Sequence, residues 1–248
     1  MVLLEITSLS KEFDGLRALD GVDFKAEGGE ILGIIGPNGA GKTTLFNLIS
    51  WIYPPSAGEI NFQGRSLLRL KPHQISRLGI GRTFQIVRPF SNLDVETNVL
   101  VAFGHPFYPS LWKSAQPFRQ PQILEEAQKL IERTGLRSYA KQLGKHLPLG
   151  IKKRLEIARA LALKPRMLLL DEPSAGLRFE ESAQLMDLIR QVRDQGIGVL
   201  LIEHNMQVVM DLCKQIVVLD HGAKIAEGPP EAIRSNPQVI QAYLGKEA

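Results

Sequence analysis

The stretch Gly36-Pro37-Asn38-Gly39-Ala40-Gly41-Lys42-Thr43-Thr44 decides the fold of this chain. It follows the apolar run 31–35 and precedes Leu45, Leu48 and Ile49, which recur at helical spacing. The expected order is therefore strand, glycine-rich turn and helix. The turn matches G-x-x-x-x-G-K-[ST], the pattern of a phosphate-binding loop, so this chain is expected to bind a nucleotide.

Each residue type in the loop has a physical role in holding phosphate. Glycines let successive backbone N–H groups turn inward on an anion, and the positive end of the following helix points at the same anion. Lys42 would place its ammonium group on the β- and γ-phosphates, the Thr43 hydroxyl would ligate Mg²⁺, and Thr44 would reach the α-phosphate. The predicted nucleotide-binding residues of the loop are Gly36, Pro37, Asn38, Gly39, Ala40, Gly41, Lys42, Thr43 and Thr44.

Two other interpretations of the loop are weaker. A glycine turn can simply connect a strand to a helix, without a ligand. A dinucleotide-binding loop also carries three glycines, but Thr44 stands where its third glycine belongs. We therefore expect a nucleoside triphosphate.

Composition sets limits on the whole chain. It has 248 residues, 44% of them hydrophobic, which supports one large domain or a core with a subdomain. The net charge of +4 is spread along the chain, and 152–154 form a helix face more readily than a binding stripe, so no nucleic-acid partner is expected. Cys213 is the single cysteine, which excludes an internal disulfide. No signal peptide or membrane-spanning run is recognised, which predicts a cytoplasmic location.

Two further apolar runs end in polar side chains. The run 167–170 is followed by Asp171 and Glu172, and the run 199–202 is followed by Glu203 and His204. Buried parallel strands deliver such groups to a site at their carboxyl ends. Asp171 would hold Mg²⁺ through water, Glu172 would deprotonate the attacking water, and His204 would touch a γ-phosphate. The alternatives are a helix-capping acid and ordinary surface residues.

The remaining segments predict an α/β fold with a mainly parallel sheet, an N-terminal antiparallel β-layer and an inserted helical subdomain. Residues 1–248 are expected to form a single domain, with 1–85 and 164–248 as the nucleotide-binding core and about 86–163 as the helical subdomain. Expected elements are a helix from Asp94 through Ala102, a stripe-bearing helix ended at Gly135, and a helix from Lys152 to Leu163. A strand is expected over 80–84, ending at Gln85. Segment 104–122 holds four prolines, which exclude one continuous helix there.

These residues resemble the ATP-binding subunits of ABC transporters over nearly the whole chain. Thr83-Phe84-Gln85 is similar to the family's glutamine loop, which implies that Gln85 senses Mg²⁺ and water and lies near the membrane subunits. Leu169 to Pro173 is similar to the second nucleotide motif, and 155–161 to the helix after the signature motif. His204 fits the switch histidine. Phe13, which on its own is as well explained by packing on the β-layer, fits the adenine-stacking aromatic residue.

A narrower resemblance, to the ATPases of branched-chain amino acid importers, lies in 82–90, 202–206 and 242–245. It implies ATP and Mg²⁺ as ligands and ATP hydrolysis that energises transport. It also implies a second ABC ATPase subunit, transmembrane permease subunits and, indirectly, a substrate-binding protein. The chain would then lie at the cytoplasmic face of the cell membrane, held there through the permease subunits.

The signature motif departs from the family pattern. The family reads close to Leu-Ser-Gly-Gly-Gln, whereas this chain has Leu147-Pro148-Leu149-Gly150-Ile151, so the serine hydroxyl is missing and only Gly150 is kept for a partner's ATP. A lost charge-assisted hydrogen bond costs roughly 1.5–3 kcal/mol, or about ten- to a hundredfold in local affinity. Arg178 is a second departure, because the family commonly has Asp or Asn there.

These departures favour a heterodimer with one sound site and leave two other functions open. One is an ATP-gated ABC module that is not part of a transporter, although such proteins usually carry two ATPase halves or long coiled-coil insertions. The other is a degenerate subunit that binds ATP and hydrolyses it poorly.

Overall fold

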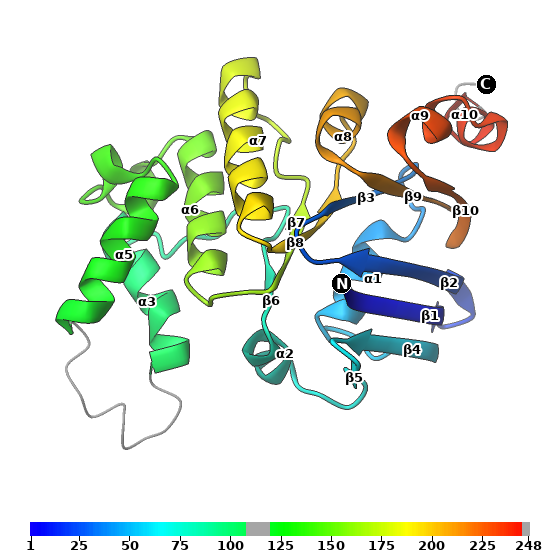
Figure 1. The fold of residues 1–248 in the computed structure, drawn as a ribbon, viewed down its shortest axis with the longest axis horizontal. Coiled ribbons are helices and arrows are strands. Elements are labelled where there is room, and N and C mark those ends of the chain that lie inside the picture. The colour runs from blue at the N-terminus through cyan, green and yellow to red at the C-terminus, as the bar shows by residue number, and fades with distance from the viewer. Residues whose placement is uncertain (108–119, 245–248) are drawn as a thin grey trace.

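The computed structural model describes residues 1–107 and 120–244, which form two sheets and the helices that cover them (Figure 1). The antiparallel sheet has the strand order β2-β1-β4-β5, and the larger sheet has the order β10-β9-β3-β8-β7-β6. The strands are β1 (Val2–Phe13), β2 (Leu16–Glu27), β3 (Ile31–Ile35), β4 (Ala57–Phe62), β5 (Arg65–Ser66), β6 (Ile80–Arg82), β7 (Met167–Asp171), β8 (Gly198–Ile202), β9 (Gln215–Asp220) and β10 (Ala223–Gly228).

Strands β6, β7, β8, β3 and β9 pair in parallel, and β10 pairs with β9 antiparallel. Every residue of β3, β7 and β8 is buried. Such continuous apolar strands are typical of a parallel sheet that is covered on both faces. The mainly parallel sheet and the separate antiparallel layer confirm the fold class expected from the sequence.

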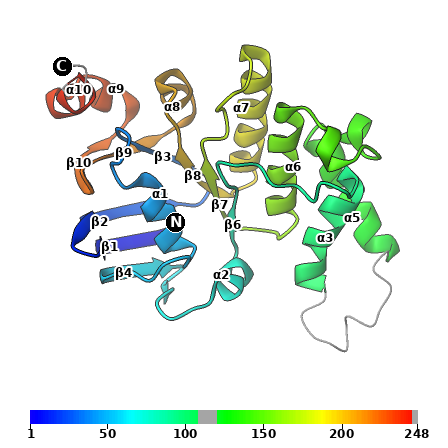
Figure 2. The ribbon, with the colours of Figure 1, turned by 180° about the vertical axis from the view of Figure 1, so that it is seen from behind.

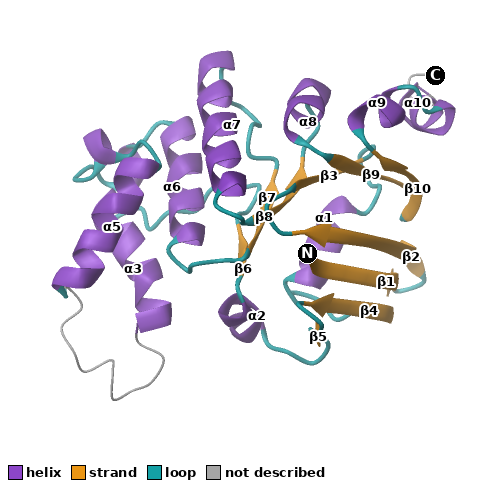
Figure 3. Ribbon diagram, in the orientation of Figure 1, coloured by secondary structure: helices purple, strands orange, loops and turns teal. Residues whose placement is uncertain are grey.

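The larger sheet separates two hydrophobic cores. In β7, Leu168 and Leu170 face a core formed with the helices, while Met167 and Leu169 face a core formed with α1 (Lys42–Ile49) and the antiparallel sheet. This alternation follows from the two-residue period of a strand. Figure 3 shows the two sheets as separate layers, with the helices that follow β7 and β8 on the opposite side of the larger sheet from the antiparallel layer.

Three helices that follow one another along the chain, α3 (Val95–Phe107), α5 (Pro121–Arg133) and α6 (Leu149–Leu161), lie beside one another at one end of the molecule (Figures 1 and 2). Short 3₁₀ turns occupy Arg137–Tyr139 and Gly144–His146. The helices are α1 (Lys42–Ile49), α2 (Pro72–Leu78), α3 (Val95–Phe107), α5 (Pro121–Arg133), α6 (Leu149–Leu161), α7 (Phe179–Asp194), α8 (Met206–Leu212), α9 (Pro230–Arg234) and α10 (Pro237–Leu244).

Several element ends differ from the expected ones. Asp94 caps α3 as predicted, because its Oδ1 accepts the Thr97 N–H at 2.7 Å, but α3 continues past Ala102 to Phe107. The helix expected from Lys152 to Leu163 runs from Leu149 to Leu161, with Pro148 at its N-cap. The strand expected over 80–84 ends at Arg82. Most of the proline-rich segment 104–122 lies outside the described residues.

The described helices are short or polar compared with a membrane span. In the two described stretches, 1–107 and 120–244, there is no helix whose length and apolar content would let it span a bilayer.

The central strand β8 provides a test of this core. Leu201 is fully buried between the sheet and the helices, so Leu201→Ala is expected to lower the free energy of unfolding by about 2–5 kcal/mol in urea denaturation. Leu16→Ala is the matched control, since Leu16 is 72% exposed, and its effect should stay within about 0.5 kcal/mol. Equal losses from the two variants would contradict the layered core.

Candidate functional site

The loop between β3 and α1 wraps around the ammonium group of Lys42. This side chain is buried, and its Nζ donates to the carbonyl oxygens of Gly36 at 2.7 Å and Pro37 at 2.8 Å. Gly36 has a φ of 148°, and a Cβ there would lie 2.0 Å from the Leu219 carbonyl oxygen. The loop therefore passes too close to β9 for any side chain at Gly36, and it already holds a cation at its centre.

Three of the predicted site residues meet at the carboxylate of Glu172. Gln85 Nε2 donates to Glu172 Oε2 at 2.8 Å, and His204 Nε2 lies 2.6 Å from Glu172 Oε1. Gln85 follows β6, Glu172 follows β7 and His204 follows β8, so neighbouring parallel strands bring them together. Glu172 itself has a φ of 48°, a left-handed conformation that is unusual for a side-chain-bearing residue.

Asp171, one residue earlier, lies deeper. It is 3% exposed, and its Oδ2 is 3.5 Å from the Arg82 guanidinium. Burial raises the pKa of the Asp171 carboxyl, against the opposing effect of Arg82. Its Oδ1 is buried without a hydrogen-bond partner among the described residues.

An unpaired carboxylate oxygen of this kind fits a metal ligand. Mg²⁺ is usually held by one or two carboxylates together with substrate phosphates and waters. The described part of the chain contains no cluster of three or more His, Cys, Asp or Glu side chains that could hold a metal ion. Thr43, Gln85 and Asp171 all line one hollow of about 770 Å³ beside the loop.

A hollow of about 530 Å³ lies directly over the phosphate-binding loop. Glu172, Gln85 and His204 reach it from the neighbouring strand ends, and Leu16, Arg17, Ala18 and His221 complete its rim; the loop lines it through Asn38, Gly39, Ala40, Gly41, Lys42, Thr43 and Thr44. The structure thus brings the predicted loop and the predicted strand-end residues to one place. The Phe13 side chain does not line this hollow. Its ring meets Tyr53 edge-on, with 5.4 Å between centroids.

Comparison with known proteins agrees with this geometry. Residues 19–175 match the family described as ABC transporter, and residues 223–248 match the one described as branched-chain amino acid ATP-binding cassette transporter. The chain belongs to the ATP-binding subunits of ABC transporters.

Full-length relatives support the same assignment. The chain is 42% identical to the high-affinity branched-chain amino acid transport ATP-binding protein BraF of Pseudomonas aeruginosa and 41% identical to LivG of Escherichia coli K12, over 98% of both chains in each case. A crystal structure of a nucleotide-free ATP-binding cassette from an ABC transporter superposes with a TM-score of 0.89 at 29% identity. That match covers 99% of this chain and 100% of the other.

The signature segment of this ABC ATPase lies away from its own phosphate-binding loop. Pro148 and Leu149 are exposed at the start of α6, and neither lines the hollow over the loop. Gly150 is buried where a Cβ would come 3.0 Å from Glu181 of α7. Glu181 Oε2 also accepts the Arg178 N–H at 3.0 Å, so Arg178 occupies the cap of α7.

Two buried charged residues near the site have contacts that the sequence did not reveal. Lys153 of α6 is buried and donates from Nζ to the Glu172 carbonyl oxygen at 2.7 Å. Glu203 is also buried and accepts the backbone N–H groups of Ser174 at 2.8 Å and His204 at 3.1 Å. The position of Glu203 directly before His204 was a usable signal, whereas Lys153 was hidden in the basic run 152–154.

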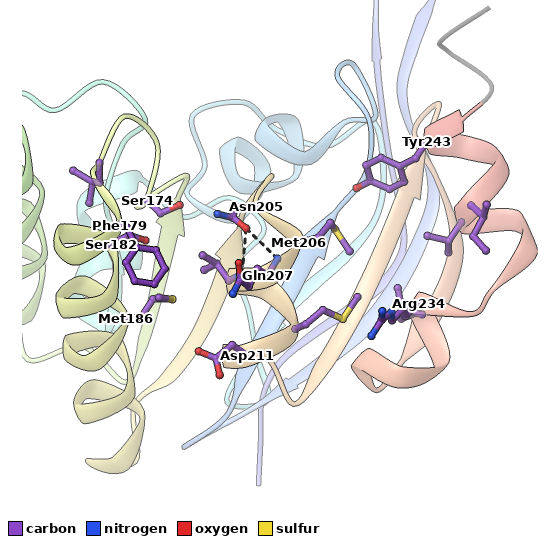
Figure 4. A pocket seen from close by; sticks show the side chains of 16 residues that line it. Ser174, Phe179, Ser182, Met186, Asn205, Met206, Gln207, Asp211, Arg234 and Tyr243 are labelled. Carbon is purple, nitrogen blue, oxygen red and sulfur yellow. Dashed lines mark hydrogen bonds between the residues drawn. The ribbon is translucent and has the colours of Figure 1, made fainter.

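A larger hollow, of about 1200 Å³, lies elsewhere in this ABC ATPase (Figure 4). Phe179 and Met186 of α7 border one side of it, and Arg234 and Tyr243 of the last two helices border the other. Its lining includes no residue of the phosphate-binding loop. The hollow over Lys42, and not this larger one, is the one that the loop and the strand-end residues line together.

The close passage of the loop beside β9 gives a test with a matched control. Gly36→Ala should lower the free energy of unfolding by more than about 3 kcal/mol, because its methyl group meets the Leu219 carbonyl. Gly39 also has a positive φ, but a Cβ there meets nothing within 4 Å, so Gly39→Ala should cost only about 1–2 kcal/mol. Denaturant unfolding without nucleotide measures both, and equal costs would contradict the tight contact between the loop and β9.

Proposed function

We propose that this ABC ATPase binds and hydrolyses Mg-ATP to energise the uptake of branched-chain amino acids. The observation that carries the proposal is the convergence of Gln85, Glu172 and His204 on the hollow over the phosphate-binding loop. The choice of cargo rests on the similarity to branched-chain amino acid transport proteins, because cargo is recognised by other subunits of such transporters.

The phosphates of ATP would lie in the loop 36–44. Lys42 now donates to two backbone carbonyls, and an arriving triphosphate would take over that ammonium group as a stronger, charged acceptor. The backbone N–H groups of the loop and the start of α1 add further donors. We assign the adenine to Phe13 or to the rim formed by residues 16–18, of which only the rim lines this hollow.

Thr43, Asp171 and Gln85 would hold Mg²⁺ beside the phosphates. Bound Mg²⁺ neutralises charge on the β- and γ-phosphate oxygens. Asp171 is suited to this role because its buried Oδ1 has no hydrogen-bond partner in the described part of the chain. Thr43 lines both hollows and would connect the metal to the loop.

Glu172 would act as the general base. Its two carboxylate oxygens accept from Gln85 and lie against His204, which fixes the carboxylate at the mouth of the hollow. A water held there can lose a proton to Glu172 while its oxygen attacks the γ-phosphorus; the bond from phosphorus to the β,γ-bridging oxygen breaks, and ADP leaves with that electron pair. Lys42 and His204 would stabilise the charge that develops on the phosphate oxygens. Glu172 would therefore both position the attacking water and accept its proton.

Permease subunits would contact an exposed apolar patch beside Gln85. The patch consists of Ile52, Tyr53, Phe84 and Ile86, which are 42–67% exposed and line the same hollow as Gln85 and Asp171. A partner seated there would be coupled to the metal site through Gln85. We propose that 86–163 acts as a helical subdomain beside this patch, within the single domain 1–248, and that the permease holds the chain at the cytoplasmic face of the membrane.

A second ABC ATPase would complete the transporter. In a head-to-tail pair, the signature segment of each subunit faces the ATP of the other, and Gly150 is the signature residue that this chain retains. Pro148 offers neither a hydroxyl nor an N–H group, so the site that borrows this segment should be slow. We infer a heterodimer with one fully competent ATP site, with a binding protein that delivers the amino acid to the permease.

The base assignment predicts the effect of Glu172→Gln. The amide cannot take up the proton, so the turnover of ATP should fall by about a hundredfold or more, while ATP binding is retained. Steady-state phosphate release and nucleotide binding measure the two effects. Glu59→Gln, an exposed change on the antiparallel sheet, should leave both unchanged. Undiminished hydrolysis by Glu172→Gln would remove Glu172 from this role.

If the functional unit is a heterodimer, the chain alone should be a poor ATPase. Purified by itself, it should hydrolyse ATP at least about tenfold more slowly than in complex with the ATPase that co-purifies with it, since only the partner supplies a complete signature. Introducing Pro148→Ser should raise the activity of the isolated chain by returning the missing hydroxyl. Full-speed hydrolysis by a homodimer of the unaltered chain would contradict the asymmetric arrangement.

A further inference from the structure

Lys153 is a buried cation on the helix that begins with the signature segment. It lies about one turn after Gly150 in α6, and its side chain is 6% exposed. Its Nζ donates to the backbone carbonyl oxygen of Glu172 at 2.7 Å. Burial lowers the pKa of the Lys153 ammonium group, and the nearby carboxylates of Glu203, Glu156 and Glu172 oppose that effect. Burying a charged side chain costs free energy, so the inward position of Lys153 calls for a structural or functional explanation.

The backbone of Glu172 needs support from its neighbours. Its φ of 48° is a conformation that residues with side chains rarely adopt, and such strain persists only where the surroundings determine it. The Glu172 N–H donates to the Ile202 carbonyl at 2.9 Å, and the Glu172 carbonyl accepts the Ala175 N–H at 3.3 Å as well as Lys153 Nζ. Both sides of the residue are thereby fixed.

Glu203 provides the matching anion on the other loop. It is 3% exposed and accepts the N–H groups of Ser174 and His204, so it joins the loop after β7 to the loop after β8. Its charge is the largest electrostatic effect that favours the protonated form of Lys153. The two buried charges therefore support the two loops that carry Glu172 and His204.

We propose that Lys153 is a positioning residue that holds Glu172 in place through its backbone carbonyl. Because Lys153 belongs to α6, it also connects the base at this chain's own ATP to the helix whose first turn faces the partner subunit's ATP. This inference rests on the proposed function, in which Glu172 is the base and the two ATPases pair head to tail. It gives the two ATP sites a direct mechanical connection within one subunit.

The test compares three variants of the full chain, assayed with its co-purifying ATPase and permease subunits. Lys153→Met removes the ammonium group and keeps the length of the stem. It should lower kcat for Mg-ATP by about tenfold or more and change KM by less than about twofold, because Lys153 does not line the hollow for the nucleotide. Lys153→Arg keeps a charged donor and should recover most of kcat. Lys129→Met, on the exposed face of α5, is the matched control and should behave as the unaltered chain, because the Lys129 side chain is 68% exposed and lines neither hollow at the site.

An unchanged kcat in Lys153→Met would overturn the proposal, as would equal defects in Lys153→Met and Lys129→Met. If Lys153→Met does not fold, Lys153→Gln takes its place, since its side chain is shorter and carries no charge. The same loss confined to kcat is expected, and an unchanged kcat contradicts the proposal. Glu172→Gln distinguishes a failure of the proposed function from a failure of the positioning role alone. If it hydrolyses ATP normally, the proposed function fails; if it is inactive while Lys153→Met is fully active, only the positioning role fails.

Discussion

The parallel pairing of β7 with β8 is the constraint on which the rest of this structure depends. Asp171, the last residue of β7, stands opposite Ile202, the last residue of β8, and β3 pairs with β8 on the other side. Parallel strands in register end at the same edge of a sheet. Three loops that are distant in the sequence therefore open side by side, and a shift of one residue would turn every buried side chain of β8 to the opposite face.

Much of this arrangement was predictable, because the signals were local. The runs 31–35, 167–170 and 199–202 are apolar and short, and each is followed by a turn or by charged residues, so both the strands and the common edge follow from the pattern. The glycines of the loop and Asp94 at the start of α3 are equally local signals. The family resemblance added Gln85 and His204, whose roles no single pattern establishes.

What the sequence did not predict depends on tertiary contacts. Lys153 stands between Lys152 and Arg154 in a basic run, and only the packing of α6 against the loop after β7 shows that this one cation is turned inward. The sequence predicts the start of α6 at Lys152, three residues too late, although a proline is compatible with the first turn of a helix. In the structure Pro148 stands at the N-cap of α6 and also removes the signature hydroxyl. That dual role explains how the signature chemistry can be lost while α6 keeps its place: the fold needs a helix start there, and only the partner's ATP needs the hydroxyl.

The central claim is that one nucleotide is held between the loop 36–44 and the acidic end of β7. A crystal structure with Mg²⁺ and a non-hydrolysable ATP analogue tests it most directly. We expect Lys42 Nζ to leave the Gly36 and Pro37 carbonyls for a phosphate oxygen, with the metal beside Thr43 and Asp171. A nucleotide bound in the larger hollow between α7 and α10, with Lys42 still on the two carbonyls, would contradict it.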